Sequence, residues 1–240
     1  MKKTLLLVIL SICIGPTISA QRHINIYAGY SILHPQNWNR TIAAYNFSRP
    51  WLINSIPEIR TAKTWGFGTS GVIGKGFFLS PEFSYSRYSS SSENPPVSVA
   101  IDLKWMRGSM YLDIYPREFK LDSVAYIIRP FFRIGGGASC LLPRIEMNNV
   151  LVEMDNETYK PIIWSYQLSA GIGCRIALSK RIDITPVILY NFMPYVNLED
   201  FSYALNGNQV PSLKDDGRLS NLFFLMSLSV RLKNDNIFEN

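Results

Sequence analysis

The sequence is poor in cysteine and histidine, and this limits the chemistry that the protein can perform. Only three cysteines and two histidines occur in 240 residues, too few for a disulfide framework or a clustered zinc site. Removal of the N-terminal leader described below leaves only Cys140 and Cys174. If their strands form a hairpin, Cys174 lies opposite about position 127, too far from Cys140 for a bridge. We therefore expect two unpaired thiols and no metal site.

The chain also lacks a block of basic residues and, beyond its first twenty positions, any long apolar run. The leader holds two of the 24 basic residues and none of the acids, leaving 22 basic and 18 acidic residues and a net charge of +4. The positive charges are scattered singly, which argues against a nucleic-acid partner. No later segment approaches the roughly 18 consecutive apolar residues of a transmembrane helix. Any membrane residence must therefore come from β-strands.

Residues 1–20 have the features of a cleaved secretory signal. Two lysines precede an apolar run, a glycine-proline pair and a cleavage site after Ala20. A lipoprotein with Cys13 as the lipidated residue is the alternative, but a bulky residue precedes Cys13 where such sites require a small one. No linker or shift in composition interrupts the rest. We expect one barrel domain over 21–233 and a polar tail at 234–240.

A strict period-two alternation identifies the best-defined β-strand. From 162 to 178 every second residue is apolar, and the residues between are mostly small or polar. One apolar face and one face of glycine, serine and glutamine suit a membrane barrel with a wet interior. Weaker versions of this pattern recur at 23–33, 60–74, 76–89, 98–115, 124–140, 181–193 and 219–232. Eight antiparallel strands can close a barrel without exposed edges.

The connections between these strands alternate in length. Long or medium ones fall at one end, at 34–59, 90–97, 141–160 and 194–218, and short ones fall at the other. Bacterial outer-membrane barrels have short periplasmic turns and longer outer loops. We therefore predict an all-β, eight-stranded, antiparallel up-and-down transmembrane barrel, a monomer in outer-membrane lipid. Ten strands stay possible if the first or last long loop contains a hairpin.

Aromatic residues on the predicted outward face gather toward the long-loop ends of the strands. Amphipathic rings favour the headgroup region, so this set is predicted to form an aromatic girdle. It comprises Tyr30, Trp65, Tyr85, Trp105, Trp164, Tyr166, Tyr190, Phe192 and Phe224.

Three strands depart from a clean alternation. In the fourth, the apolar residues change parity after Trp105, which predicts a bulge near Arg107-Gly108. Pro130 and Pro186 fall inside the fifth and seventh strands and cannot donate a ladder hydrogen bond. We expect a local irregularity or a bulge at each proline.

Several phrases combine strand residues with proline, aromatic residues and glycine. They are FFLSPEFSYSR at 77–87, YLDIYPREF at 111–119, RPFFRIGGGAS at 129–139 and the strand pair at 164–192. In these phrases, and over most of 23–232, the chain resembles the outer-membrane β-barrel domain family of Bacteroidota, the PorT-like group. The charged residues after Pro116 depart from the family, which usually continues apolar there. The resemblance implies an integral outer-membrane protein. PorT itself is an accessory of a protein-secretion system, but nothing in these residues singles out that role.

The predicted inward face carries charges of both signs. They are Glu82, Asp113, Arg129, Arg133, Arg175, Asp183 and Arg231. An eight-stranded barrel is only wide enough for side chains to fill, so we interpret these residues as ion pairs that plug the lumen. A narrow ion-selective pore or proton path is the alternative, and it requires the pairs to rearrange.

No residue is predicted to be catalytic or to bind a cofactor. Hydrolases and acyltransferases need a nucleophile, a base and an orienting group together. Only His34 would lie at the outer rim, and no motif places a serine or aspartate against it. Asp215-Asp216 precedes a glycine, which is typical of a solvated turn. We expect no enzymatic activity, with an outer-leaflet lipid-modifying enzyme that uses His34 as an alternative.

The long loops carry aromatic residues among amides, a composition that suits contact with a glycan or a protein. These residues are Trp38, Tyr45, Trp51, Phe201 and Tyr203. Packing of the loops over the barrel mouth is the interpretation that we favour for them. The expected role is structural, accessory or recognition through the outer loops. The main competitor is a secreted, lipocalin-like barrel whose apolar face surrounds a hydrophobic ligand.

Overall fold

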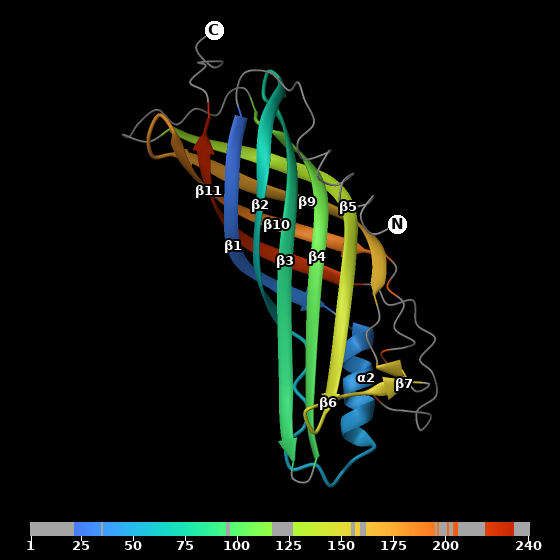
Figure 1. Ribbon diagram of the computed structural model, residues 1–240. Coiled ribbons are helices and arrows are strands. Elements are labelled where there is room, and N and C mark those ends of the chain that lie inside the picture. The colour runs from blue at the N-terminus through green and yellow to red at the C-terminus, as the bar shows by residue number, and fades with distance from the viewer. Residues whose placement is uncertain are drawn as a thin grey trace.

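Eight long antiparallel strands form a closed barrel in the computed structural model (Figure 1). The structure describes residues 22–34, 36–94, 97–116, 127–154, 157–158, 162–194, 196, 201, 204–205 and 219–232. The barrel strands are β1 (Arg22–His34), β2 (Thr61–Gly74), β3 (Phe77–Asn94), β4 (Val97–Ile114), β5 (Ile127–Met147), β9 (Ile163–Ala177), β10 (Ile182–Met193) and β11 (Leu219–Arg231). Each pairs with the next along the chain, and β1 pairs with β11 to close the ring. The predicted eight-stranded up-and-down barrel is confirmed.

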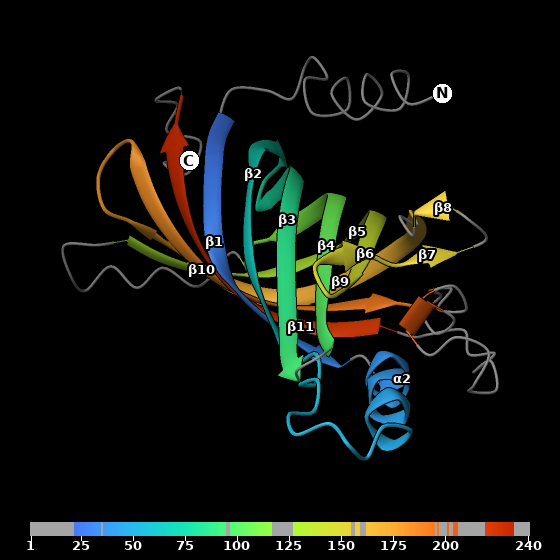
Figure 2. The ribbon, with the colours of Figure 1, turned by 60° about the horizontal axis from the view of Figure 1, so that its bottom comes forward.

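The two ends of the barrel differ. One end, called here the terminal end, holds the start of β1, the end of β11 and the tight turn between β2 and β3. The other, the long-loop end, holds the helix α2 (Gln36–Phe47), which Figure 2 shows beside the end of β3. Three short strands follow β5: β6 (Val150–Leu151), β7 (Glu153–Met154) and β8 (Glu157–Thr158), of which β7 pairs with β8.

Three strands continue past the long-loop end as a projecting sheet. β3 reaches Asn94 and β5 reaches Met147, beyond the predicted ends at 89 and 140. We call residues 87–94, 97–104 and 141–147 the blade (Figure 1). The predicted medium loop at 90–97 is wrong, because Asn94 pairs with Val97 in a tight hairpin. The predicted loop at 141–160 begins instead as the end of β5, which turns into β6 through two asparagines with positive φ.

The polarity of the two faces inverts along β4. Toward the terminal end, the buried inward residues are polar or aromatic and the outward residues apolar: Arg107, Tyr111 and Asp113 face in, whereas Met106, Met110, Leu112 and Ile114 face out. In the blade the order is reversed: Val99, Ile101 and Leu103, followed by Trp105 at its border, are buried inside, whereas Ser98, Ala100, Asp102 and Lys104 face out.

The bulge predicted near Arg107-Gly108 is therefore wrong. β4 keeps one register with β3 and with β5 along its whole length. Trp105 is only 2% exposed and points inward, so its assignment to the outward aromatic girdle is also wrong. The apolar residues change face because the surroundings of the strand change, whereas the strand itself continues without slipping.

The prolines disturb the ladders less than expected. Pro130 keeps its register opposite Cys174, so no bulge forms there. At Pro186 the pairing with β9 is interrupted over two residues and then resumes in the same register. The register shift that the structure does show lies in β2, between Val72 and Gly74. Cys140 and Cys174 are free thiols, as predicted.

Candidate functional site

Arg133 of β5 joins two acidic side chains inside the barrel. Its Nε and Nη2 donate to the two carboxylate oxygens of Asp113 at 2.6 and 2.9 Å. Its Nη1 donates to Glu82 Oε1 at 2.7 Å, and Ser80 Oγ donates to Asp113 Oδ2 at 2.9 Å. All four side chains are buried. Such bidentate, charge-assisted pairs fix both partners, so β3, β4 and β5 are tied together through the lumen.

A second polar cluster lies toward the terminal end. Asp183 of β10 lies 3.4 Å from His23 Nδ1 and 3.4 Å from an Arg231 guanidinium nitrogen. Arg175 of β9 lies over the rings of Phe78 and Tyr115, at 5.0 and 5.4 Å from their centroids. Arg129 is half-buried on the inward parity of β5. The predicted lumen charges therefore point inward but form two clusters instead of one network.

A third contact spans the lumen near the long-loop end. The rings of Trp105 on β4 and Phe223 on β11 have centroids 6.0 Å apart. Arg107 lies against both, with its Cζ 4.8 Å from the Trp105 ring and 4.0 Å from the Phe223 ring. β4 and β11 are separated by other strands in both directions around the ring, so this contact crosses the barrel. Sequence reasoning missed Arg107, which it had placed in a bulge.

A small cavity is described between the inward side chains. A cavity of about 20 Å³ lies among Tyr27, Glu82, Arg133 and Arg175, which is room for about one water molecule. Inward aromatic rings also fill the space opposite glycines: a Cβ at Gly66 would meet the ring of Tyr27. A lipocalin-like barrel needs an apolar interior around its ligand, whereas the described lumen holds buried Glu82, Arg133 and Asp183, which favours the membrane barrel over this competitor.

The helix α2 covers the apolar inner face of the blade. Trp38, Ile42 and Tyr45 repeat at the spacing of one helical face, and all three are at most 2% exposed. They belong to one buried cluster with Ile101 and Leu141 of the blade. Burial raises the pKa of Tyr45 above its ordinary value, partly offset by Arg49, so its phenol stays neutral. The helix thus gives the projecting sheet a core of the soluble kind.

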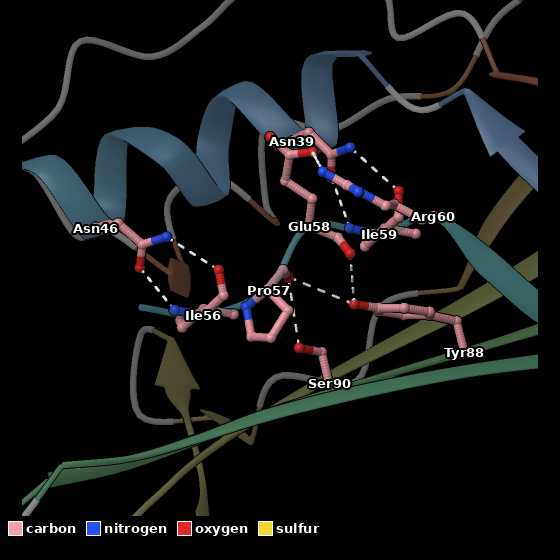
Figure 3. A network of polar contacts seen from close by, with 9 residues as sticks. All are labelled: Asn39, Asn46, Ile56, Pro57, Glu58, Ile59, Arg60, Tyr88 and Ser90. Carbon is pink, nitrogen blue, oxygen red and sulfur yellow. Dashed lines mark hydrogen bonds and ion pairs between the residues drawn. The ribbon is translucent and has the colours of Figure 1, made fainter. Parts of the chain in front are cut away.

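An extended segment at 56–60, called here the strap, is clamped to α2 by two asparagine side chains (Figure 3). Asn39 Nδ2 donates to the Ile59 carbonyl at 3.1 Å, and Asn39 Oδ1 accepts from the Ile59 N–H at 2.8 Å. Asn46 makes the same two bonds with Ile56, each at 3.0 Å. The two asparagines lie two helical turns apart, so their amides act as two rungs of a ladder between helix and strap.

The strap is also bound to β3. Tyr88 Oη donates to the carbonyls of Pro57 and Glu58 at 3.4 and 3.2 Å, and Ser90 Oγ donates to Pro57 at 3.4 Å (Figure 3). Ile56 and Ile59 are at most 2% exposed. We call α2 and the strap together the cap. The cap is held by hydrogen bonds and apolar contacts over the inner face of the blade.

The loop aromatics predicted as possible binding residues separate into two groups. Trp38, Tyr45 and Phe201 are buried, and the rings of Trp38 and Phe201 lie 4.5 Å apart. Their burial agrees with packing of the long connections over the barrel mouth, the interpretation favoured from the sequence, and a binding role for them stays a prediction. Trp51 is 70% exposed, and Tyr203 lies outside the described residues. Sequence reasoning missed Phe47 and Ile53, which are 90% and 85% exposed.

The other predicted girdle residues face outward. Each of them is exposed or half-exposed on the outer parity of its strand: Tyr30, Trp65, Tyr85, Trp164, Tyr166, Tyr190, Phe192 and Phe224. Trp65 and Tyr85 are cross-strand neighbours, with ring centroids 5.3 Å apart. The placement of these rings in a lipid headgroup layer stays a prediction.

The described residues offer no metal centre, because no three histidine, cysteine, aspartate or glutamate side chains are grouped to hold an ion. Within the same part of the chain, no helix has both the length and the apolar character to cross a membrane. The side chain of His34, the residue of the enzymatic alternative, lies outside the described residues.

Comparison with known proteins gives similarity only at the level of solved structures. No family model matches the chain, and no curated protein matches it. Neisserial surface protein A is 11% identical with a TM-score of 0.46, over 88% of this chain and 99% of that one. Ail of Yersinia pestis is 9% identical with a TM-score of 0.42, over 90% and 100%. OprG from Pseudomonas aeruginosa is 9% identical with a TM-score of 0.43, over 88% and 96%. With values this low, nothing about those proteins' partners or activities is transferred to this chain.

Proposed function

We propose that this chain is an integral outer-membrane β-barrel protein with a closed lumen. Its blade and cap project from the outer surface and serve a structural, accessory or recognition role. Residues 1–20 act as the export signal, and the polar 234–240 tail stays on the periplasmic side. Membership of the PorT-like group is part of the proposal and rests on the sequence phrases alone. Enzymatic activity is not part of it.

The inversion of polarity along continuous strands carries this proposal. In the barrel the outward side chains are large, apolar and exposed, among them Ile26, Leu168 and Met226 at 54–63%. A soluble monomer rarely exposes a continuous apolar belt to water, whereas a barrel in a bilayer has such a belt in contact with lipid. In the blade the outward side chains are polar and the apolar ones turn inward under α2. A strand that passes from lipid into water needs this change of face.

The filled lumen supports a role outside transport. The contact of Trp105 with Phe223 crosses the interior, and the Arg133 ion pairs hold charged side chains of the adjacent strands β3, β4 and β5 inside it. The cap covers the apolar face of the blade beyond them. The surfaces left for a partner are the outer face of the blade and the exposed end of the cap.

The mature protein is expected to fractionate with membranes and to need detergent for extraction. On cold SDS gels its mobility is expected to change after boiling, because a closed ladder of strands stays folded in SDS until it is heated. A soluble protein without a mobility shift would contradict the proposal and favour a secreted barrel. A membrane-bound protein with a shift would support it.

The folded protein in planar bilayers is expected to show no discrete single-channel steps. Opening would require the Arg133 pairs to separate and leave charges unpaired in a narrow interior, which is strongly unfavourable. Folding of the same preparation is verified by the heat-dependent mobility shift. Discrete currents that change on replacement of Arg129, Arg133 or Arg175 would contradict the closed lumen and favour the pore.

A further inference from the structure

Three basic side chains form a row across the outer face of the sheet, at the border between the apolar belt and the blade. Lys63 of β2 lies opposite Arg87 of β3, and Arg87 lies opposite Lys104 of β4. All three occupy the outward parity of their strands. The next outward pair toward the barrel is Trp65 with Tyr85. The row therefore lies one step beyond the aromatic residues that face outward.

The charges of this row are incompletely balanced by the described acidic residues. Like charges directly opposite each other in a sheet repel. Asp102 accepts from Arg87 Nε at 2.8 Å and lies 3.7 Å from Lys104 Nζ. Lys63 makes no ion pair with any residue that the structure describes. One carboxylate thus serves two of the three cations and leaves Lys63 without a described ion pair, an arrangement that a bound anion would stabilise.

A hollow in the outer face of the blade lies beside the row. It has a volume of about 280 Å³, and Arg87, Lys104 and Arg144 line it together with Asp102 and Glu146. Its remaining lining comes from small residues, Ser89, Ser90, Ser91 and Ala100, and from Ile101. Arg144 is paired with Glu146 at 2.6 Å. Small hydroxyl-bearing residues between charged ones leave room for a polar group the size of a sugar ring.

We propose that Lys63, Arg87 and Lys104 bind the phosphate groups of a phosphorylated glycolipid of the outer leaflet, with its sugars against the blade hollow. The inference rests on the proposed membrane placement, because the row then lies at the level of lipid headgroups. Acyl chains of the same lipid would extend along Tyr85 and Met106 toward the apolar belt. A membrane lipid is favoured over a free phosphate because the site opens directly onto that belt.

The test uses the mature protein in phosphatidylcholine nanodiscs that contain a small fraction of bis-phosphorylated, hexa-acylated lipid A. Native mass spectrometry after transfer to detergent counts the lipid A molecules retained. The parent is expected to retain lipid A, and not its dephosphorylated form, with inorganic phosphate unable to compete. The triple variant Lys63→Gln, Arg87→Gln, Lys104→Gln is expected to bind roughly a hundredfold more weakly, since each cation at a membrane surface contributes about a fivefold factor.

A matched control removes the same charge at the opposite end of the barrel. The variant Lys75→Gln, Lys180→Gln, Arg181→Gln changes three exposed turn residues and is expected to retain lipid A like the parent. Equal retention by both triple variants, equal loss by both, or competition by free phosphate would overturn the glycolipid site. A parent that fails to enter nanodiscs would overturn the membrane proposal as well, so the two failures are distinguishable.

Discussion

Replacement of Arg133 by methionine is expected to lower the free energy of unfolding by about 3–5 kcal/mol. The guanidinium makes two bonds to Asp113 and one to Glu82, and all three residues are buried. Without it, two carboxylates are left close together in the lumen with no cation between them. The measurement is the urea midpoint of the folded, fast-migrating gel band in phosphatidylcholine vesicles.

Two further variants separate this effect from a general loss of charge. Arg60→Met removes an exposed arginine whose partner Glu58 is also exposed, and about 1 kcal/mol or less is expected there. The triple variant Arg133→Met, Glu82→Gln, Asp113→Asn also removes the two unpaired carboxylates. It is expected to recover most of the lost free energy of unfolding. The interpretation of the lumen as a structural ion-pair plug fails if Arg133→Met is as stable as Arg60→Met.

The strand pattern was predictable because the barrel strands carry exposed apolar residues on the outward face. Alternation at 162–178 marks β9, whose bounds are Ile163 and Ala177. Inward charges could also be assigned by parity, so that Glu82, Asp113 and Arg133 were expected inside. Their grouping around one arginine could not be predicted, because it depends on how strands two steps apart in the ring approach each other.

The blade was not predicted because its apolar residues lie on the inward face, whereas those of the barrel lie on the outward face. Apolar residues at 99–105 were assigned to the outward face, whereas in the blade the outward residues are polar and the apolar ones are buried on the inner face. Trp105 and Arg107 were misplaced for this reason. Serines on both faces at 89–92 weakened the signal of β3 still further. A change of apolar parity within a strand predicts a bulge only when both ends of the strand meet the same solvent.

The sequence contains a helical pattern that predicts the cap, but a search for period-two strands does not find it. Trp38, Ile42 and Tyr45 follow helical spacing, and so do Asn39 and Asn46, seven positions apart. Trp38, Ile42 and Tyr45 share one face of the helix, which explains why they are buried together. Asn39 and Asn46 also share a face, which explains why both amides reach the strap. The partner of those amides is backbone at 56–59, which no residue pattern specifies.

Trp38→Ala is expected to open the cap while the barrel stays closed. Loss of a buried tryptophan typically costs about 3–5 kcal/mol, and Trp38 is 1% exposed in contact with Phe201. The packing that holds α2 against the blade is local to the long-loop end, so the strap should become accessible. The measurement is limited trypsin digestion of the folded protein, followed by mass spectrometry of cleavage after Arg60.

Trp51→Ala provides the matched control, since Trp51 belongs to the same long connection but is 70% exposed. Its effect is expected to stay within about 0.5 kcal/mol, with protection at Arg60 unchanged. Both variants should keep the heat-dependent mobility shift, because no barrel strand is altered. Rapid cleavage in the Trp38 variant alone would establish the cap as a separately stabilised unit. Equal protection in the two variants would mean that the Asn39 and Asn46 bonds hold the strap without the aromatic core.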